Sequence, residues 1–448
     1  MPCTHVTRAH YKCKARSSAG SSQDIATVFI EKSDVPSYTA ASAQDTHEVF
    51  VIFHDDGFTV YEPNHCYIEH QVSGDFSNFV LQPPYGISLH TLCDGEKPCS
   101  WGSAVNVRNR FIYVSQPLLN RVIVIEIQKR SNPVEVITTD AVPVRLQYVR
   151  HLDQVWVVCW NDVNGAGSRS VIIIREASKG KRHGIVHPQS VTGGLDQMDD
   201  VFLPPSNDLQ ETFDYGYAMQ RGQEAIYKLN MHTMQYMKTI DLSSRLCVPQ
   251  SVAFVPIGGQ VMVQCAPRSS ESMKSSRLVL DYTTDEIVSH SESGGDIYVS
   301  PDSRYVILVD SEGNTLTVSS VADNGKLEYV YDEYTNTHIS AVTFFPSDSG
   351  RGYDLYASSK DKNDVLYMNL NSGKVEMIEG VGQPPELSAW HWNKHGRSIV
   401  SSGIFGEYLM TVSHDAVVMI DGKRRHVQCE WQNIKQGNVI VWVDPNHL

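Results

Sequence analysis

The stretch Val299-Ser300-Pro301-Asp302-Ser303-Arg304-Tyr305-Val306 is the part of the sequence that best defines the fold. It places a Pro-Asp turn between two segments of strand-forming residues. Proline presets its own φ angle and the aspartate side chain bonds nearby backbone, so such a turn forms locally. The phrase is typical of the turn between the first two strands of a β-propeller blade. Many propeller families contain it, so it predicts architecture and leaves function open.

Short strand-like segments recur through the rest of the chain. After Thr46 helical periodicity is nearly absent, and runs of Val, Ile, Tyr and Phe alternate with Gly, Asn, Asp and Pro. The clearest group of four such runs is Ser103–Val107, Phe111–Ser115, Val122–Ile127 and Val134–Thr138. Six further groups begin near Val144, Asp199, Gln250, Asp296, Ile339 and Ile399. Four strands at a spacing of about 40 to 60 residues indicate propeller blades, and the missing Gly-His and Trp-Asp signature argues against WD repeats.

The strands left over lie at the two ends of this region. His47–His54, Phe58–Glu62 and Cys66–His70 supply three strands, and Asn438–Val443 supplies one. In the last segment the alternating side chains are apolar on both faces, as a central buried strand requires. One face would carry Val439, Val441 and Val443, and the other Ile440 and Trp442. We therefore expect an all-β propeller of eight blades in which Asn438–Val443 pairs with Val49–Phe53; seven blades with decorated ends is the alternative.

The first residues indicate a different domain. Tyr11-Lys12-Cys13 is followed by Ala19-Gly20 and the alternating segment Ile25–Ile30. A Tyr two residues before a Cys is typical of the tyrosine corner of an immunoglobulin domain. The earlier strands and the cysteine that would bond Cys13 are missing, so we expect Cys13 to be unpaired. Residues 1–31 are thus interpreted as the truncated C-terminal part of an immunoglobulin-like domain, 32–46 as a linker and 47–448 as the propeller.

Composition and charge exclude several classes of partner. The chain has 51 acidic and 37 basic side chains and a formal net charge of −14. A field of this sign repels phosphate backbones, so we expect no nucleic-acid partner. Apolar runs such as Val171–Ile174 are far shorter than the roughly 18 residues of a membrane-spanning helix. No apolar segment typical of a signal peptide follows Met1, and no Asn-x-Ser/Thr sequon is present.

Few motifs carry chemistry. His54-Asp55-Asp56-Gly57 has the residue types of a metal site, but Asp-Gly is a usual hairpin pair, so we interpret it as a turn. Ser413-His414-Asp415 has the residue types of a catalytic triad, but neighbours along a strand point to opposite faces, so we interpret it as a turn as well. Trp390 and Trp392 are either a ligand platform or packing residues between blades. No catalytic residue, metal or cofactor is predicted.

Two basic segments stand out from the acidic background. The candidate patches for an anionic, sulfated glycan are Lys179, Lys181 and Arg182, and Lys423, Arg424 and Arg425. We favour the alternative, in which both are solvated hairpin loops.

Several segments resemble, in the same order, the C-terminal region of the follistatin-related protein 4 and 5 family. The segments are Ser103–Val107, Phe111–Val114, Asp153–Val157, Asp199–Pro204, Cys247–Ser251, His338–Ser340, Ser402–Thr411 and Asn438–Val443. The resemblance covers essentially the whole chain. It implies a secreted protein with a follistatin/Kazal-type module, EF-hands and immunoglobulin domains ahead of this region. The family's calcium loops would lie upstream, and the EF-hand spacing is absent from this chain.

The resemblance also accounts for most of the nine cysteines. Six match family positions: Cys66, Cys93, Cys99, Cys247, Cys265 and Cys429. The strands that follow Cys247 and precede Cys265 fold back on each other, which places these two residues opposite each other within disulfide range. We also expect Cys93 to bond Cys99 in a small loop and Cys66 to bond Cys429 across the ring closure. Cys3 and Cys159 have no family counterpart, and Cys159 is interpreted as a small buried hydrophobe.

Two functions follow from these observations. The first is a non-enzymatic extracellular module that presents propeller loops to a protein or matrix partner. The alternative is a propeller enzyme of the lactonase or quinoprotein type, which needs a metal or cofactor held in the central channel. Three or more acidic or histidine side chains converging on the channel would favour the enzyme, whereas the family resemblance favours the binding module.

Overall fold

The computed structural model describes residues 11–16, 27–32, 48–73, 79–81, 88–90, 92–94, 98–127, 132–180, 182–188, 198–205, 213–266, 275–310, 312–386, 388, 390–393, 396–403, 406–437 and 439–444. Contacts between Cα atoms divide the chain into two compact units, Met1–Thr46 and His47–Leu448. Regular structure in the described part consists of β-strands and short 3-10 turns, without an α-helix. None of the described segments is a helix of the length and apolarity that a membrane span requires.

The first unit contains two described strands. β1 (Tyr11–Arg16) pairs antiparallel with β2 (Thr27–Lys32), and Cys13 lies opposite Ile30 in this register. The side chain of Cys13 lies outside the described part. The immunoglobulin interpretation and the unpaired state of Cys13 therefore stay predictions.

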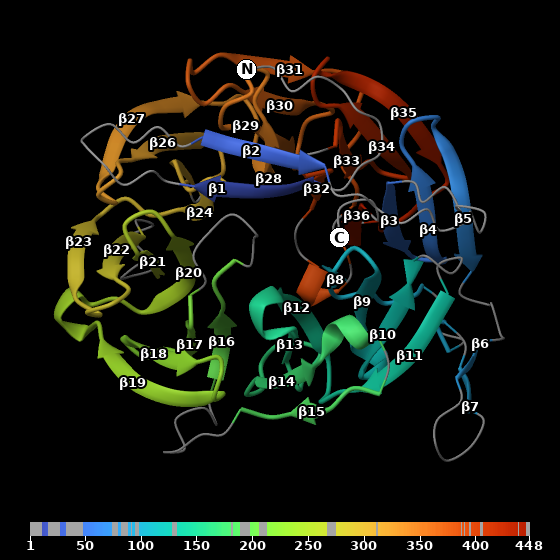
Figure 1. Ribbon diagram of the computed structural model, residues 1–448, viewed down its shortest axis with the longest axis horizontal. Helices are drawn as coiled ribbons and strands as arrows, with labels where there is room; N and C mark the ends of the chain where they lie inside the picture. The colour runs from blue at the N-terminus through green and yellow to red at the C-terminus, as the bar shows by residue number, and fades with distance from the viewer. Residues whose placement is uncertain are drawn as a thin grey trace. The chain divides into compact units, whose positions relative to one another are not determined.

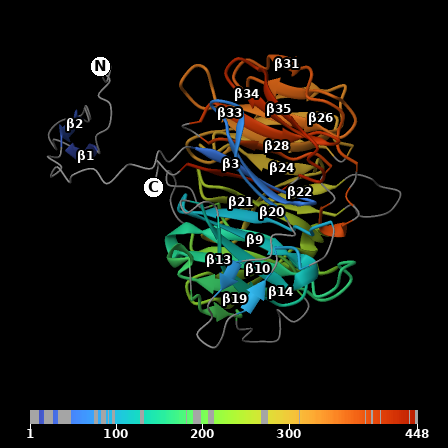
Figure 2. The same ribbon diagram turned by 90° about the vertical axis from the view of Figure 1, so that its right-hand side faces the viewer.

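The second unit is a ring of eight four-stranded antiparallel sheets (Figures 1 and 2). Blade 1 consists of β36 (Val439–Val443), β3 (Val49–His54), β4 (Gly57–Glu62) and β5 (Tyr67–Ser73). Blade 2 consists of β8 (Ala104–Val107), β9 (Phe111–Gln116), β10 (Arg121–Glu126) and β11 (Asn132–Thr138). Blade 3 consists of β12 (Pro143–Val149), β13 (Gln154–Cys159), β14 (Ser170–Arg175) and β15 (Ile185–Val186). Blade 4 consists of β16 (Met198–Phe202), β17 (Tyr215–Gln220), β18 (Ala225–Asn230) and β19 (Gln235–Asp241).

The other four blades follow the same order. Blade 5 consists of β20 (Pro249–Val255), β21 (Gln260–Cys265), β22 (Ser276–Asp281) and β23 (Ile287–Ser291). Blade 6 consists of β24 (Asp296–Val299), β25 (Tyr305–Val309), β26 (Thr315–Val321) and β27 (Leu327–Tyr334). Blade 7 consists of β28 (Ile339–Pro346), β29 (Tyr353–Ser359), β30 (Val365–Met368) and β31 (Val375–Ile378). Blade 8 consists of β32 (Ile399–Ser401), β33 (Tyr408–Val412), β34 (Ala416–Asp421) and β35 (His426–Gln432). A separate hairpin of β6 (Phe79–Leu81) and β7 (Ser88–His90) lies between blades 1 and 2 in the sequence.

The predicted Pro-Asp turn joins β24 to β25. Asp302 accepts hydrogen bonds from the Ser300 hydroxyl at 2.6 Å and the Arg304 backbone N–H at 3.2 Å. The Ser300 hydroxyl oxygen in turn accepts the Tyr305 N–H at 3.0 Å, where β25 begins. These three hydrogen bonds all join residues of the turn itself, as the sequence predicted.

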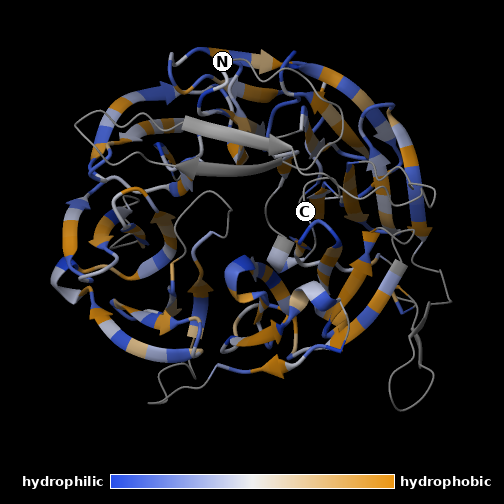
Figure 3. Ribbon diagram, in the orientation of Figure 1, coloured by the Kyte–Doolittle hydropathy of each residue, from blue (hydrophilic) through white to orange (hydrophobic). Residues whose placement is uncertain are grey.

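Apolar side chains on both faces of the middle strands hold neighbouring blades together. Eight clusters of buried residues lie one at each junction between consecutive blades. In β9, for example, Ile112 and Val114 pack toward blade 1, whereas Phe111 and Tyr113 pack toward blade 3. Outer strands have one exposed face, and Figure 3 shows them with mixed colours along the rim. Burial on two faces explains why the middle strands read as nearly continuous apolar runs.

The two ends of the propeller region share blade 1, and eight blades are confirmed. β36 pairs antiparallel with β3, with Val49 opposite Val443 and Phe53 opposite Val439. The two faces of β36 divide as the sequence predicted. Its three valines enter the cluster with blade 2, and Ile440 and Trp442 enter the cluster with blade 8. The alternative of seven blades with decorated ends is wrong.

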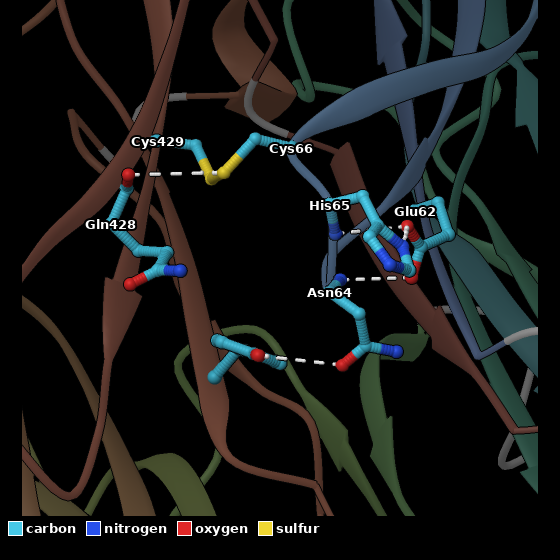
Figure 4. Close-up of a disulfide and its surroundings, with 7 residues drawn as sticks. Glu62, Asn64, His65, Cys66, Gln428 and Cys429 are labelled. Carbon is cyan, nitrogen blue, oxygen red and sulfur yellow. Dashed lines mark hydrogen bonds and ion pairs between the residues drawn. A yellow bond between two sulfur atoms is a disulfide. The ribbon is translucent and has the colours of Figure 1, made fainter.

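A disulfide between Cys66 and Cys429 joins blade 1 to blade 8 (Figure 4). Its Cα atoms lie 5.8 Å apart. Cys429 is in the outer strand β35, whereas Cys66 occupies the turn just before β5 rather than a strand. The buried Glu62 carboxylate organises that turn, because it accepts the backbone N–H groups of Asn64 at 2.8 Å and His65 at 3.0 Å. Burial opposes the charge on Glu62, but these hydrogen bonds outweigh it and lower the pKa of Glu62.

The other two expected disulfides are present as well. Cys93 is bonded to Cys99, and Cys247 to Cys265, with Cα separations of 5.3 and 5.0 Å. Cys159 ends β13 as a free thiol with no exposed surface, packed in the cluster between blades 2 and 3. Burial raises the pKa of the Cys159 thiol to about 12. Cys159 is thus the small buried hydrophobe that its sequence context predicted.

Removing the closing disulfide should cost more stability than removing a local one. In the loop-entropy model, a sequence separation of 363 corresponds to about 6 kcal/mol and a separation of 6 to about 2 kcal/mol. We expect the double variant Cys66→Ser/Cys429→Ser to unfold at lower denaturant concentration than Cys93→Ser/Cys99→Ser. Equal midpoints for the two variants would show that the closing bond does not restrict the unfolded chain.

Glu62→Gln should destabilise the propeller at neutral pH by about 1–3 kcal/mol, because two backbone N–H groups lose a charged acceptor. The lowered pKa of Glu62 sets the sign of the pH dependence. The contribution of Glu62 to the free energy of unfolding is complete above the ordinary glutamate pKa and is lost as the pH falls through the lowered pKa of the folded protein. Melting temperatures of the two proteins should therefore converge in acid, and a constant difference from neutral to acidic pH would contradict this role.

Candidate functional site

A cavity of about 440 Å³ lies where the inner strands of six blades begin. Its lining includes Ala104 at the start of β8, Arg145 in β12 and Asp200 in β16. It is completed by Ala341 in β28 of blade 7, across the ring, and by Val439 in β36 of the neighbouring blade 1. The innermost strands of a propeller surround its central channel, so this cavity is the mouth of that channel.

Arg145 links blade 3 to blade 4 at this mouth. Its guanidinium donates two hydrogen bonds to the Asp200 carboxylate, at 3.0 Å and 2.5 Å, and one to the Val201 carbonyl. The same group lies over the Phe202 ring, 5.2 Å from its centroid. Bidentate pairing fixes the position of the guanidinium as well as its charge.

A second arginine completes the polar cluster. Arg169 lies 3.7 Å from Asp200 and 3.6 Å from Asp199, and its guanidinium stacks 5.0 Å from the centroid of the Trp160 ring. Its buried Nε has no hydrogen-bond partner. Arg221 approaches Asp199 from the outside at 3.2 Å. Three guanidinium groups therefore meet two carboxylates, and the cluster carries a formal charge of +1.

The two tryptophans singled out in the sequence lie together. Trp390 and Trp392 are stacked, with ring centroids 5.3 Å apart and an interplanar angle of 8°. Trp392 lines the channel-mouth cavity and donates its indole N–H to the Trp101 carbonyl at 3.2 Å. The buried indole N–H of Trp390 has no partner. Trp392 therefore lines the cavity with Trp390 stacked on it, and whether the pair is a ligand platform or packing between blades stays open.

The composition of the channel mouth bears on the two functions drawn from the sequence. Among the residues that line the described cavity, Asp200 is the one carboxylate and histidine is absent. Asp200 is held by Arg145 and Arg169, so its charge is already compensated. This cavity therefore does not gather the three acidic or histidine side chains that the enzyme alternative requires.

The two motifs with the residue types of a metal site and of a catalytic triad form turns. His54 and Gly57 face each other across the β3–β4 hairpin, and the buried His54 ring bonds the Thr59 hydroxyl at 2.9 Å. Burial lowers the pKa of His54 in spite of the neighbouring Asp55 carboxylate. Ser413 to Asp415 connect β33 to β34, and the Ser413 N–H donates to the Ala416 carbonyl at 2.8 Å.

The basic segments lie on blades 3 and 8, which blades 1 and 2 separate, so they do not form one patch. Lys179 pairs with Glu176, and Lys423 pairs with Glu407. Arg424 lies 3.8 Å from Asp421. Arg425 lies 2.8 Å from Asp348 and 2.9 Å from Glu376. Lys181 lies outside the described residues, and the Arg182 backbone N–H donates to Glu135 at 3.1 Å. A sulfated glycan would compete with these carboxylates, and glycan binding stays a prediction.

The rim of blade 6 was not singled out from the sequence. In its outer strand β27, Tyr329, Val330 and Tyr334 are 66%, 42% and 76% exposed. The strand also carries three acidic residues, Glu328, Asp332 and Glu333. A β-bulge opposite Ser319 interrupts the alternation, which explains how neighbouring residues 329 and 330 are both exposed. The sequence did not reveal this surface, because the exposure of both Tyr329 and Val330 depends on the bulge and not on the alternation of residue types along the strand.

A groove adjoins the end of β27. It has a volume of about 430 Å³ and is lined by Glu333 and Tyr334 from blade 6 and by Lys362, Asp364 and Met377 from blade 7. Met377 is 44% exposed. Exposed aromatic and methionine side chains beside a groove are typical of protein-binding surfaces.

Comparison with known proteins shows the fold and no family. No family model matches the sequence. Similar solved structures include dihydro-heme d1 dehydrogenase NirN in complex with DHE, with 10% identity and a TM-score of 0.59 over 90% of this chain and 76% of that chain. Apo AztD from Citrobacter koseri has 10% identity and a TM-score of 0.54 over 89% of this chain and 98% of that chain. The protein is thus an eight-bladed β-propeller, and at this identity the likeness extends to the fold alone.

The ion-pair cluster at the channel mouth should contribute to stability. Asp200→Asn removes the charge that two arginines share, and we expect a loss of about 1–3 kcal/mol in the free energy of unfolding. The matched control is Glu176→Gln, which breaks a pair that is 62% and 58% exposed and should change stability by less than about 0.5 kcal/mol. Denaturant titration measures both, and similar small losses would mean that Asp200 does not hold blades 3 and 4 together.

Proposed function

We propose that this propeller is a non-enzymatic extracellular binding module of the follistatin-related protein 4 and 5 family. The order of the matching segments supports the family. The three disulfides support an oxidising compartment, because such bonds persist outside the cytosol. In this proposal the propeller is a rigid scaffold within a secreted multidomain protein, and its partner is a protein or a matrix component.

The observation that carries the proposal is the exposed surface of β27. Large apolar side chains that stay in water add no burial free energy to folding, and Tyr334 is 76% exposed. Tyrosine is enriched among the residues that dominate binding energy in protein interfaces. The position of Tyr329 and Tyr334 on the rim, beside the groove with Met377, suits a protein partner better than a small molecule.

The charges around these tyrosines indicate the chemistry of the partner. Glu328 and Glu333 flank the exposed apolar residues, and Asp332 is held in place by the Thr317 hydroxyl, which donates to it at 2.7 Å. A partner surface with Lys or Arg around an apolar centre would complement this strand. β27 is also the edge strand of its sheet, so its outer backbone groups are available to a partner strand.

The middle of β27 is anchored to blade 7, which limits the motion of the strand. Tyr331 points inward and donates its hydroxyl to the Leu370 carbonyl of blade 7 at 3.2 Å. Burial raises the pKa of Tyr331 to about 12, so the hydroxyl keeps its proton. Anchoring the middle of the strand lowers the entropy that a partner would have to remove on binding.

A comparison of captured proteins tests the proposal. The purified chain is immobilised, exposed to conditioned medium and matrix extract, and the retained proteins are quantified by mass spectrometry. We expect at least one partner to be retained by the unchanged protein and reduced at least tenfold with Tyr329→Ala/Tyr334→Ala, since losing two anchors of about 1 kcal/mol or more each has this effect.

Tyr67→Ala is the matched control, because Tyr67 is a 43% exposed tyrosine on the outer strand of blade 1. It should retain the same partner. Equal retention by all three proteins would remove β27 from the interface.

Six free thiols in the protein isolated from its source, at positions 66, 93, 99, 247, 265 and 429, would contradict the extracellular location.

A further inference from the structure

Three side chains with metal-binding atoms converge on the face of the ring opposite the channel mouth. They are His151 in the loop from β12 to β13, Asp214 just before β17, and His232 in the turn from β18 to β19. One ligand atom from each lies within 4.8 Å of the other two. These loops join the first strand to the second and the third to the fourth, whereas the channel mouth lies where the first strands begin. The cluster is therefore separate from the candidate site described above.

The contacts within the cluster resemble a metal site that lacks its ion. His232 Nε2 lies 2.9 Å from Asp214 Oδ1. The rings of His151 and His232 meet edge to face, with centroids 5.8 Å apart. The ring nitrogens of the two imidazoles and the carboxylate oxygen are all atoms that commonly bind transition metal ions.

The backbone around each ligand is held in place. The Met231 N–H, next to His232, donates to the Asp214 carbonyl at 2.9 Å, so two of the ligands share one hydrogen-bonded segment. His151 belongs to the 3-10 turn Arg150–Leu152, which ends in a left-handed residue, Asp153. Arg108 of blade 2 donates to the Arg150 carbonyl at 3.1 Å and fixes this turn from the other side. The backbone at His151, Asp214 and His232 is thus fixed by hydrogen bonds within and between blades.

We propose that His151, Asp214 and His232 form a binding site for a divalent transition metal ion such as Zn²⁺, which joins blade 3 to blade 4. Two imidazoles and one carboxylate suit Zn²⁺, Ni²⁺ or Cu²⁺ rather than Ca²⁺ or Mg²⁺, which prefer oxygen ligands. Zinc bonds its ligand atoms at about 2.0–2.2 Å, so atoms around one ion lie at most about 4.4 Å apart. Small rotations of these exposed side chains bring the three atoms within that distance.

Three protein ligands leave a coordination position for water or for a side chain of another molecule. In the metal-free protein the hydrogen bond between His232 and Asp214 occupies the place of the ion. When Zn²⁺ binds His232 Nε2, the proton of that bond moves to Nδ1 or is released to solvent, and the ion holds the same two groups together with His151. The inference does not depend on the function proposed above, because it uses none of the residues of β27.

Metal titration of the untagged chain, stripped with EDTA, tests the site. Isothermal titration with Zn²⁺ should show one saturable site, and Co²⁺ should give the visible absorption bands of a nitrogen- and oxygen-ligated ion. His151→Ala and His232→Ala should each weaken Zn²⁺ binding at least tenfold. All three ligand side chains are exposed, so these variants should keep the melting temperature of the metal-free protein.

His187→Ala is the matched control. His187 also lies beside a carboxylate, 3.1 Å from Asp140, but among the described residues it belongs to no group of three metal-binding side chains. Zinc binding by this variant should equal that of the unchanged protein. If His151→Ala, His232→Ala and His187→Ala all bind Zn²⁺ as the unchanged protein does, or if no saturable site is found, the proposal is overturned.

Discussion

Pairing of β36 with β3 is the interaction on which the rest of the propeller depends. Without it, blade 1 would consist of three strands, and β3 would expose an unpaired edge inside the ring. Val441 of β36 also packs toward blade 2, and Ile440 toward blade 8, so the same strand completes two of the eight junctions. Closure is therefore a contact between residues at opposite ends of the propeller region, and the Cys66–Cys429 bond secures it at the rim.

The eight junctions also determine where recognition can take place. Because each blade is buried on both faces, its middle strands cannot offer side chains to a partner. Surface chemistry is confined to the channel mouth, the loops and the outer strands. The rim of blade 6 and the loops of blades 3 and 4 are such places, and all of them are carried by strands whose positions the buried clusters fix.

Much of the fold could be predicted because its signals are local. The turn at Pro301-Asp302 is closed by its own side chains, and the alternation of Val439, Ile440 and Val441 is visible in three consecutive residues. The polar sites could not be found in this way. Arg145 meets Asp200 only because blades 3 and 4 are neighbours, and His151 meets His232 for the same reason. Nothing in either segment of sequence specifies which loop of the next blade it will face.

Burial of Cys159 has a consequence for oxidative folding. Thiolates attack disulfides, so an unpaired cysteine in a chain with three disulfides is a potential catalyst of disulfide scrambling. The seal between blades 2 and 3 excludes Cys159 from solvent, and a thiol with a pKa of about 12 has almost no thiolate at neutral pH. Once the junction between blades 2 and 3 is complete, its packing keeps Cys159 from attacking the disulfides formed at Cys66, Cys93, Cys99, Cys247, Cys265 and Cys429.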